Sequence, residues 1–275
     1  MNVGKKELWI EKRYVTIPVW TNEPLQKLEV FCEEVDGRRK IFEFRIQQVS
    51  EGSQREKSYD ARLDVEVFAG KKLIFEGAFP DTFFGKIQNV DAVESDGKSS
   101  DAEYRPEVHF TPKNGWMNDP NGLVYQDGTY HMYFQHNPFD INWENMCWGH
   151  AVSTDLLHWE QQDTVLFPDE HGTIFSGSGV VNEKGLLGLP RDALVFFYTA
   201  AGNCNDWAAG RNFTQRLAYS RDGGKTFTKS DLGEVETISW ENRDPKVFWH
   251  EESRAYIMVL WIEGNTFGRN CWMPI

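Results

Sequence analysis

Short runs of alternating apolar and polar residues dominate the first third of the chain and predict β-strands rather than helices. In each run, successive side chains would point to opposite faces of a sheet, and Asp36-Gly37 and Ala69-Gly70 supply turns between runs. We therefore expect an antiparallel β-sandwich-like domain over residues 1–90, with no candidate catalytic residue. The expected strands are Tyr14–Val19, Leu28–Cys32, Ile41–Ile46, Ala61–Phe68 and Lys72–Phe75.

A polar segment follows and has the composition of a linker. Residues 91–104 contain the run Glu94-Ser-Asp-Gly-Lys-Ser-Ser100 and almost no apolar side chain. Such a stretch cannot contribute much to a core, so we place a linker at 91–104 and a second domain at 105–275.

A loose internal repeat occupies the second domain and predicts blades of a β-propeller. Two apolar strands followed by a Ser-x-Asp turn and an aromatic residue occur twice, with the turns at Ser153-Thr-Asp155 and Ser220-Arg-Asp222. This period suits four-stranded blades with long loops. We expect both aspartates to accept backbone N–H groups in their turns and assign them no chemistry. About two blades and part of a third are expected, from strands at Thr129–Gln135, Trp148–Val152, Leu194–Thr199, Leu217–Tyr219 and Tyr256–Trp261.

Composition and charge narrow the function classes. The 11 Trp, 9 Tyr and 19 Phe suit β-sheet cores and sugar-stacking platforms alike. A formal net charge of -13 argues against nucleic acid and against an anionic membrane surface as partners. No apolar run is long enough to span a membrane and the first residues are charged, so we expect a cytoplasmic protein. Scattered cysteines and the lack of His-rich or glycine-rich phosphate motifs imply no metal and no organic cofactor.

Three short motifs carry the candidate chemistry. Taken singly, each is typical of a plain turn: Asp-Pro-Asn-Gly is a common turn sequence, Arg-Asp a common surface pair, and a Gly-Ser run a flexible connection. Together with the amide of Gln135 and the indole of Trp143, however, they supply the functional groups of a sugar site. The motifs are Trp116-Met-Asn118-Asp119-Pro-Asn-Gly122, Phe175-Ser176-Gly-Ser178 and Arg243-Asp244-Pro245.

Breaking a glycosidic bond usually takes two carboxyl groups. One protonates the leaving oxygen, and the other attacks the anomeric carbon or activates water. Amides such as Asn118 and Gln135 can hold sugar hydroxyls as both donors and acceptors, and Trp143 offers an apolar face.

The three motifs in this order resemble glycoside hydrolase family 32, which includes invertases, levanases and inulinases. The resemblance covers about residues 105–261 and implies a five-bladed β-propeller, incomplete in this chain. It implies Asp119 as the nucleophile, Asp244 as the carboxylate that stabilises the transition state, and Arg243 as its partner in substrate binding. It also implies a fructose subsite lined by Asn118, Gln135, Trp143, Phe175 and Ser176.

The resemblance also implies a general acid, a Glu followed by Cys, located after Arg-Asp-Pro. Glu251, Glu252 and Glu263 follow Asp244, but none precedes a cysteine, and the family pattern breaks off after about Gly268. On this ground we expect a truncated catalytic domain and little or no hydrolysis by these 275 residues alone.

The expected activity is hydrolysis of terminal β-D-fructofuranosyl linkages in sucrose or fructans, with retention. One alternative is an inactive or non-catalytic fructan-binding protein that keeps the sugar subsite. A second is a sialidase, because Ser220 to Phe227 fits the Asp-box of that class, although no arginine triad or tyrosine nucleophile accompanies it. The sequence leaves open the choice among sucrose, levan and inulin.

Overall fold

The computed structural model describes residues 3–48, 55–92, 105–235, 237–263 and 270–273. Contacts divide the chain into two units, Met1–Met117 with Asn137–Asn145, and Asn118–His136 with Met146–Ile275. Most of the predicted linker at 91–104 lies outside the described residues, so that assignment stays a prediction.

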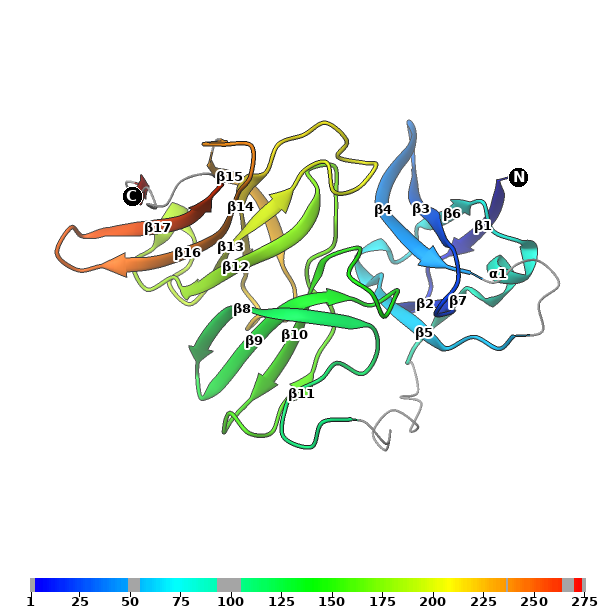
Figure 1. Cartoon of the computed structure of the whole chain (residues 1–275), viewed down its shortest axis with the longest axis horizontal. Helices are drawn as coiled ribbons and strands as arrows, with labels where there is room; N and C mark the ends of the chain where they lie inside the picture. Colours follow the sequence, from blue (N-terminus) through cyan, green and yellow to red (C-terminus); the bar gives the residue numbers. More distant parts are fainter. Residues whose placement is uncertain (1–2, 49–54, 93–104, 236, 264–269, 274–275) are drawn as a thin grey trace. The chain divides into compact units, whose positions relative to one another are not determined.

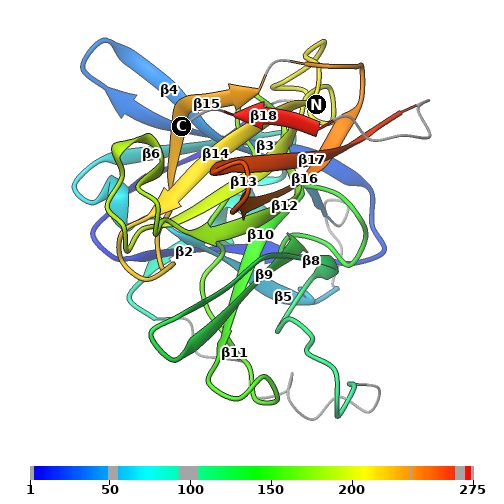
Figure 2. The same ribbon diagram turned by 90° about the vertical axis from the view of Figure 1, so that its left-hand side faces the viewer.

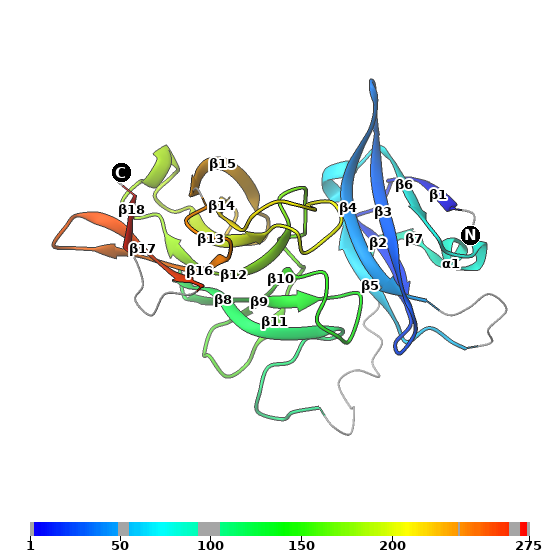
Figure 3. The same cartoon turned by 45° about the horizontal axis from the view of Figure 1, so that its top comes forward.

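The first unit contains two antiparallel sheets, as the alternating pattern predicts (Figure 1). Strands β3 and β4 form a long hairpin around Gly37, which has φ +137°, a region that favours glycine (Figure 3). One sheet has the order β1-β6-β3-β4, from Gly4–Trp9, Lys72–Gly77, Leu25–Glu34 and Gly37–Gln47. The other has the order β5-β2-β7, from Tyr59–Asp64, Tyr14–Val19 and Gln88–Val90.

The strand predicted at Ala61–Phe68 is wrong in its second half. Strand β5 ends at Asp64, and Glu66–Phe68 forms a 3-10 turn instead. The Asp64 carboxylate accepts the backbone N–H of Glu66 at 2.9 Å, which favours a turn over a further strand residue. A short helix, α1 (Asp81–Lys86), was not predicted, since six residues show no clear helical period.

The second unit is built from three antiparallel sheets that follow one another along the chain, the arrangement of propeller blades (Figure 1). The predicted strands are confirmed. The first sheet is β8 (Trp116–Gln126), β9 (Thr129–Asn137), β10 (Cys147–Ser153) and β11 (Glu160–Gln161). The second is β12 (Thr173–Val181), β13 (Leu194–Ala201), β14 (Thr214–Ser220) and β15 (Thr228–Val235), and a short 3-10 turn, Leu186–Gly188, lies between β12 and β13. The third is β16 (Asn242–His250), β17 (Ala255–Ile262) and β18 (Asn270–Met273).

Aromatic side chains join these sheets. Tyr133 of β9 is fully buried and meets Phe196 of β13 edge to face, with ring centroids 4.8 Å apart. Phe227, which follows the second Ser-x-Asp turn, stacks on Phe196 at 4.4 Å. Phe227 therefore helps to fill the core between the first and second sheets. Figure 2 shows the next junction, where β16 runs alongside β12.

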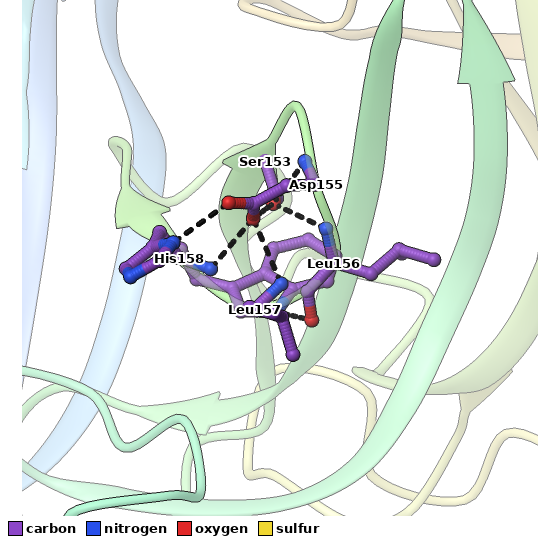
Figure 4. Close-up of polar contacts among 6 residues, drawn as sticks. Ser153, Asp155, Leu156, Leu157 and His158 are labelled. Atoms are coloured by element: carbon purple, nitrogen blue, oxygen red, sulfur yellow. Dashed lines mark hydrogen bonds and ion pairs between the residues drawn. The ribbon is translucent and has the colours of Figure 1, made fainter.

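Both Ser-x-Asp turns have the structural role expected of them. In the first, the Asp155 carboxylate accepts the backbone N–H groups of Leu157 and His158 at 2.9 and 2.8 Å (Figure 4). In the second, Asp222 accepts the N–H groups of Lys225 and Thr226 at 3.1 and 3.0 Å. These carboxylates are occupied by their own turns.

The three chemical motifs are not turns, contrary to how each reads alone. Each lies at the start of the first strand of its sheet, in β8, β12 and β16. The pairing register shifts between Ile174 and Gly177 and between Arg243 and Lys246, which marks β-bulges. A bulge adds an unpaired residue and re-aims side chains. Gly177 and Pro245 therefore lie at bulges in strands rather than in turns.

Candidate active site

Asp119 lies on β8 with an exposed side chain. Its Oδ2 accepts a hydrogen bond from the Ser176 hydroxyl at 2.7 Å, across the boundary between the first and second sheets. A single hydroxyl donor leaves the other carboxylate oxygen available to a ligand. The first two motifs of the sequence therefore meet directly at Asp119.

A second bond joins the same two strands behind this contact. The Asn121 Oδ1 accepts the backbone N–H of Gly177 at 3.3 Å, and Asn121 is 1% exposed. Gly177 sits so close to β13 that an added Cβ would lie 1.9 Å from the Phe197 carbonyl oxygen. A glycine is required there, and it lets the bulge of β12 bring Ser176 to Asp119.

Asp244 lies in the bulge of β16 with its backbone in the left-handed region, at φ +60°. Non-glycine residues rarely adopt this conformation, and it is often found at functional sites. Partial burial raises the pKa of the Asp244 carboxyl, Arg243 lowers it, and the negative charge of Asp119 raises it; the result lies above the ordinary value. The negative charge of Asp119 therefore acts on the ionisation of Asp244.

Arg243 is held on three sides. Its guanidinium lies 3.6 Å from the ring centroid of Trp261, its Nη1 donates to Glu241 at 3.0 Å, and its Nε lies 3.5 Å from Asp244. Stacking on an indole leaves the edge of the guanidinium free to donate in its plane. Arg243 can therefore bind a sugar hydroxyl while it balances the charge of Asp244.

Hydroxyl groups from the second sheet hold the segment around Asp244. The Thr199 Oγ1 accepts the backbone N–H of Asp244 at 3.0 Å. The Ser178 hydroxyl donates to the Pro245 carbonyl at 2.8 Å and accepts the Val247 N–H at 2.9 Å. The Phe-Ser-Gly-Ser motif thus serves both carboxylate strands, Ser176 contacting β8 and Ser178 contacting β16.

Three other predicted residues lie in the same unit. Gln135 of β9 is 2% exposed, and its Nε2 finds no hydrogen-bond partner among the described residues. An unpaired buried donor is costly, which is consistent with a donor kept for a ligand. Phe175 accepts the Trp148 ring N–H on its carbonyl at 3.0 Å and packs edge to face on Phe213. Asn118 is half-buried beside Asp119 on β8.

Trp143, the remaining predicted residue, belongs to the first unit, in the loop that follows β9. Its side chain is 50% exposed. Contacts within the first unit anchor the loop on β4: the Asn145 side chain bonds both the N–H and the carbonyl of Arg45, at 2.7 and 2.8 Å. The Gln47 amide donates to the buried Asp140 carboxylate at 2.7 Å. Trp143 is therefore an exposed residue on a fixed loop.

Several residues of the site escaped the sequence reasoning. Asn121 and Ser178 lie inside the quoted motifs, but the motifs do not reveal which of their residues hold neighbouring strands. Thr199 and Gln215 lie on β13 and β14 and carry no local signal at all. Only the packing of the second sheet on β16 brings them near Asp244.

With this geometry established, comparison with known proteins is informative. Residues 109–269 match the model described as "Glycosyl hydrolases family 32 N-terminal domain". The chain belongs to glycosyl hydrolase family 32. The family resemblance inferred from the three motifs is confirmed.

Characterised relatives agree with this assignment. The levanase of Bacillus subtilis (strain 168) is 43% identical over 171 residues, which is 60% of this chain and 24% of the levanase. The invertase of Schizosaccharomyces pombe is 42% identical over 173 residues, 58% of this chain and 29% of the invertase. The chain therefore spans only about a quarter to a third of the length of these relatives.

Solved structures of the family give the same result. The fructofuranosidase from Schwanniomyces occidentalis complexed with fructose has a TM-score of 0.51 and 43% identity, covering 57% of this chain and 31% of that one. A family 32 glycoside hydrolase from Bifidobacterium adolescentis covers 93% of this chain and 45% of its own, with a TM-score of 0.50 and 21% identity. At that identity, this second likeness concerns the fold alone.

Neither a metal centre nor a membrane-spanning helix is found in the part of the chain that the structure describes. There, His, Cys, Asp and Glu side chains form no group of three or more suited to bind a metal ion. The described helices are too short and too polar to cross a bilayer. Cys32 and Cys147 are buried, and Cys204 is half-buried.

Proposed function

We propose that the protein containing this chain hydrolyses terminal β-D-fructofuranosyl linkages in sucrose or in fructans such as levan and inulin. The single observation that supports this most strongly is the junction of β8, β12 and β16, where Asp119, Ser176 and Asp244 of three separate motifs converge. Relatives of known structure are described as complexed with fructose and with fructosylnystose, and these ligands define the proposed substrate class.

In the proposed mechanism, Asp119 attacks the fructosyl anomeric carbon, displaces the leaving sugar and forms a covalent fructosyl-enzyme. Water then cleaves this ester and releases fructose, and the two successive inversions give net retention. The exposed carboxylate of Asp119 and its Ser176 partner suit a nucleophile held in one orientation. Asp244 and Arg243 would hold the fructosyl hydroxyls through charge-assisted hydrogen bonds that strengthen in the transition state.

A retaining mechanism also needs a general acid to protonate the leaving oxygen. The family resemblance assigns this role to a Glu followed by Cys, and residues 1–275 contain no such pair. We therefore assign the acid to no residue described above. Gln135, Asn118 and Phe175 are proposed to bind the fructosyl unit.

The proposal is tested by measuring fructose release from sucrose, levan and inulin with the full-length protein and its Asp119→Asn variant. The expected loss is on the order of 10⁴-fold in kcat, because the amide cannot form the glycosyl-enzyme bond. Asp155→Asn is the matched control, as the same chemical change in a turn aspartate, and should retain activity within about twofold.

The outcomes separate the candidate functions. Fructose release that disappears with Asp119→Asn but persists with Asp155→Asn supports the hydrolase. Release unaffected by Asp119→Asn contradicts the proposed nucleophile. Fructan binding that both variants retain, without release by the unaltered protein, would instead favour a non-catalytic fructan-binding protein.

A further inference from the structure

The backbone of Asp244 has an uncommon conformation that its surroundings must maintain. With φ +60° in a bulge of β16, this residue carries a steric cost relative to an ordinary strand conformation. Such conformations persist only where neighbouring groups hold them. The question is which groups hold Asp244.

A chain of buried hydrogen bonds from the second sheet ends on the Asp244 backbone. Thr199 accepts the Asp244 N–H at 3.0 Å and donates its own proton to the Gln215 Oε1 at 2.7 Å. Gln215 in turn donates from Nε2 to the Asn242 carbonyl at 2.6 Å. Thr199 and Gln215 are both 0% exposed.

The direction of each bond in this chain is fixed. The Asn242 carbonyl can only accept, so the Gln215 amide nitrogen faces it and the amide oxygen faces Thr199. That oxygen accepts the single hydroxyl proton of Thr199, and the lone pairs of the Thr199 Oγ1 remain to accept the Asp244 N–H. These hydrogen bonds can therefore form in one arrangement only, and such a network rigidifies the backbone of Asp244 that it holds.

We infer that Thr199, oriented by Gln215, is a positioning residue that fixes Asp244 in its left-handed conformation and so directs the Asp244 carboxylate toward Asp119. This inference rests on the proposed fructosidase function, in which the Asp244 carboxylate binds the fructosyl group. Ser178 independently holds the Pro245 carbonyl and the Val247 N–H, so the loss of Thr199 alone should shift Asp244 without unfolding β16.

The test is a double-mutant cycle in the full-length protein. Thr199→Val removes the hydroxyl at nearly constant shape, and Thr199→Ser restores it. Each is made alone and together with Asp244→Asn, and kcat and KM for sucrose are measured. Thr214→Val is the matched control: Thr214 is the chain neighbour of Gln215, and its buried hydroxyl has no partner among the described residues.

Thr199→Val should lower kcat/KM by about 10²-fold, because displacement of a catalytic group by about 1 Å costs that much. Thr199→Ser should restore kcat/KM to within about threefold of the unaltered protein, and Thr214→Val should leave kcat/KM unchanged. In the Asp244→Asn background, the further loss from Thr199→Val should shrink to about threefold or less, since the carboxylate it positions is gone.

Equal losses in both backgrounds would overturn the inference, as would failure of Thr199→Ser to rescue. Should Thr199→Val not fold, Gln215→Leu replaces it, since it frees the Thr199 hydroxyl to rotate; its loss should likewise depend on the Asp244 carboxylate. Asp119→Asn in the same assay separates the two hypotheses: activity retained there refutes the proposed function, whereas activity lost there with an additive cycle refutes only the role of Thr199.

Discussion

Aspartates occur in two different settings in the second unit, and the contrast shows how the fold separates structural from chemical carboxylates. Asp155 and Asp222 sit in Ser-x-Asp turns and are surrounded by donors from their own turns. Asp119 and Asp244 sit near the starts of first strands, and the charge of Asp119 acts on Asp244.

The pKa directions express this contrast. A hydrogen bond from the His158 side chain and backbone bonds from His158 and Leu157 lower the pKa of Asp155. Burial raises the pKa of Asp222, but bonds from Thr226 and Ser220 outweigh it and lower the pKa overall. The pKa of Asp244 is raised instead. Hydrogen-bond donors stabilise the carboxylates of Asp155 and Asp222 as anions. At Asp244, by contrast, burial and the charge of Asp119 outweigh the effect of Arg243.

Asp244→Asn tests the contrast with the largest expected effect. Activity of the full-length protein should fall by about 10²- to 10³-fold, because an amide cannot supply the negative charge that the transition state requires. Stability should not fall with it. Since the folded pKa of Asp244 lies above its unfolded value, the stabilising contribution of this carboxyl is complete below the unfolded pKa and is lost as pH rises through the folded pKa.

The corresponding measurement is thermal unfolding of both proteins at two pH values. At pH 7 the variant should melt at the same temperature as the unaltered protein or slightly above it, and the difference should close near pH 4, where the carboxyl takes up its proton. If the variant were markedly less stable than the unaltered protein at pH 7, Asp244 would have a structural role like that of Asp155 and Asp222, and the contrast would be wrong.

Asp222→Ala should show the opposite division of effects. The turn loses the acceptor for two backbone N–H groups and for the Thr226 hydroxyl, which should lower the free energy of unfolding by about 1–3 kcal/mol. The folded fraction should keep its kcat, since Asp222 contacts only its own turn in these bonds. Urea unfolding and activity per folded molecule measure both quantities, and a loss of kcat at full folding would contradict the assignment.

His158→Gln tests the ion pair within the Ser-x-Asp turn of Asp155, and we expect it to have the smallest effect on stability. The His158 Nδ1 lies 2.7 Å from Asp155, whose hydrogen bond and charge raise the pKa of His158. The contribution of the histidine is complete below its unfolded pKa and is lost as pH rises through the raised folded value. The stabilising contribution of Asp155 is present above its unfolded pKa and is lost as pH falls through the lowered folded pKa.

The ion pair should therefore stabilise most between about pH 4 and pH 6.5. Urea midpoints of the unaltered protein and His158→Gln should differ near pH 5.5 and coincide near pH 9. His158 is 88% exposed, so the difference will be small and should weaken further in high salt. A difference independent of pH would assign the effect to packing.

The sequence pattern predicted the parts of the fold that local order specifies and failed for the parts that depend on neighbouring strands. Alternation predicted strands such as β2, β9 and β13, and the spacing of the Ser-x-Asp turns predicted the blades. Local signals failed where backbone conformation depends on neighbours. Asp-Pro-Asn-Gly and Arg-Asp-Pro have turn sequences, yet they lie in β8 and β16, which pair with β9 and β17. Within Arg-Asp-Pro only Arg243 is paired, and Asp244 and Pro245 form the bulge.

The site divides in the same way. The sequence by itself determined the all-β class and the repeat, because these follow from residue types and their local order, and the family resemblance of its motifs predicts Asp119, Asp244 and Arg243 as site residues. Only the tertiary structure decided that Ser176 contacts Asp119 and that Thr199 and Gln215 hold Asp244. The Ser176–Asp119 and Thr199–Asp244 contacts join residues tens of positions apart on different sheets, and no local pattern records a partner that packing alone brings within hydrogen-bonding distance.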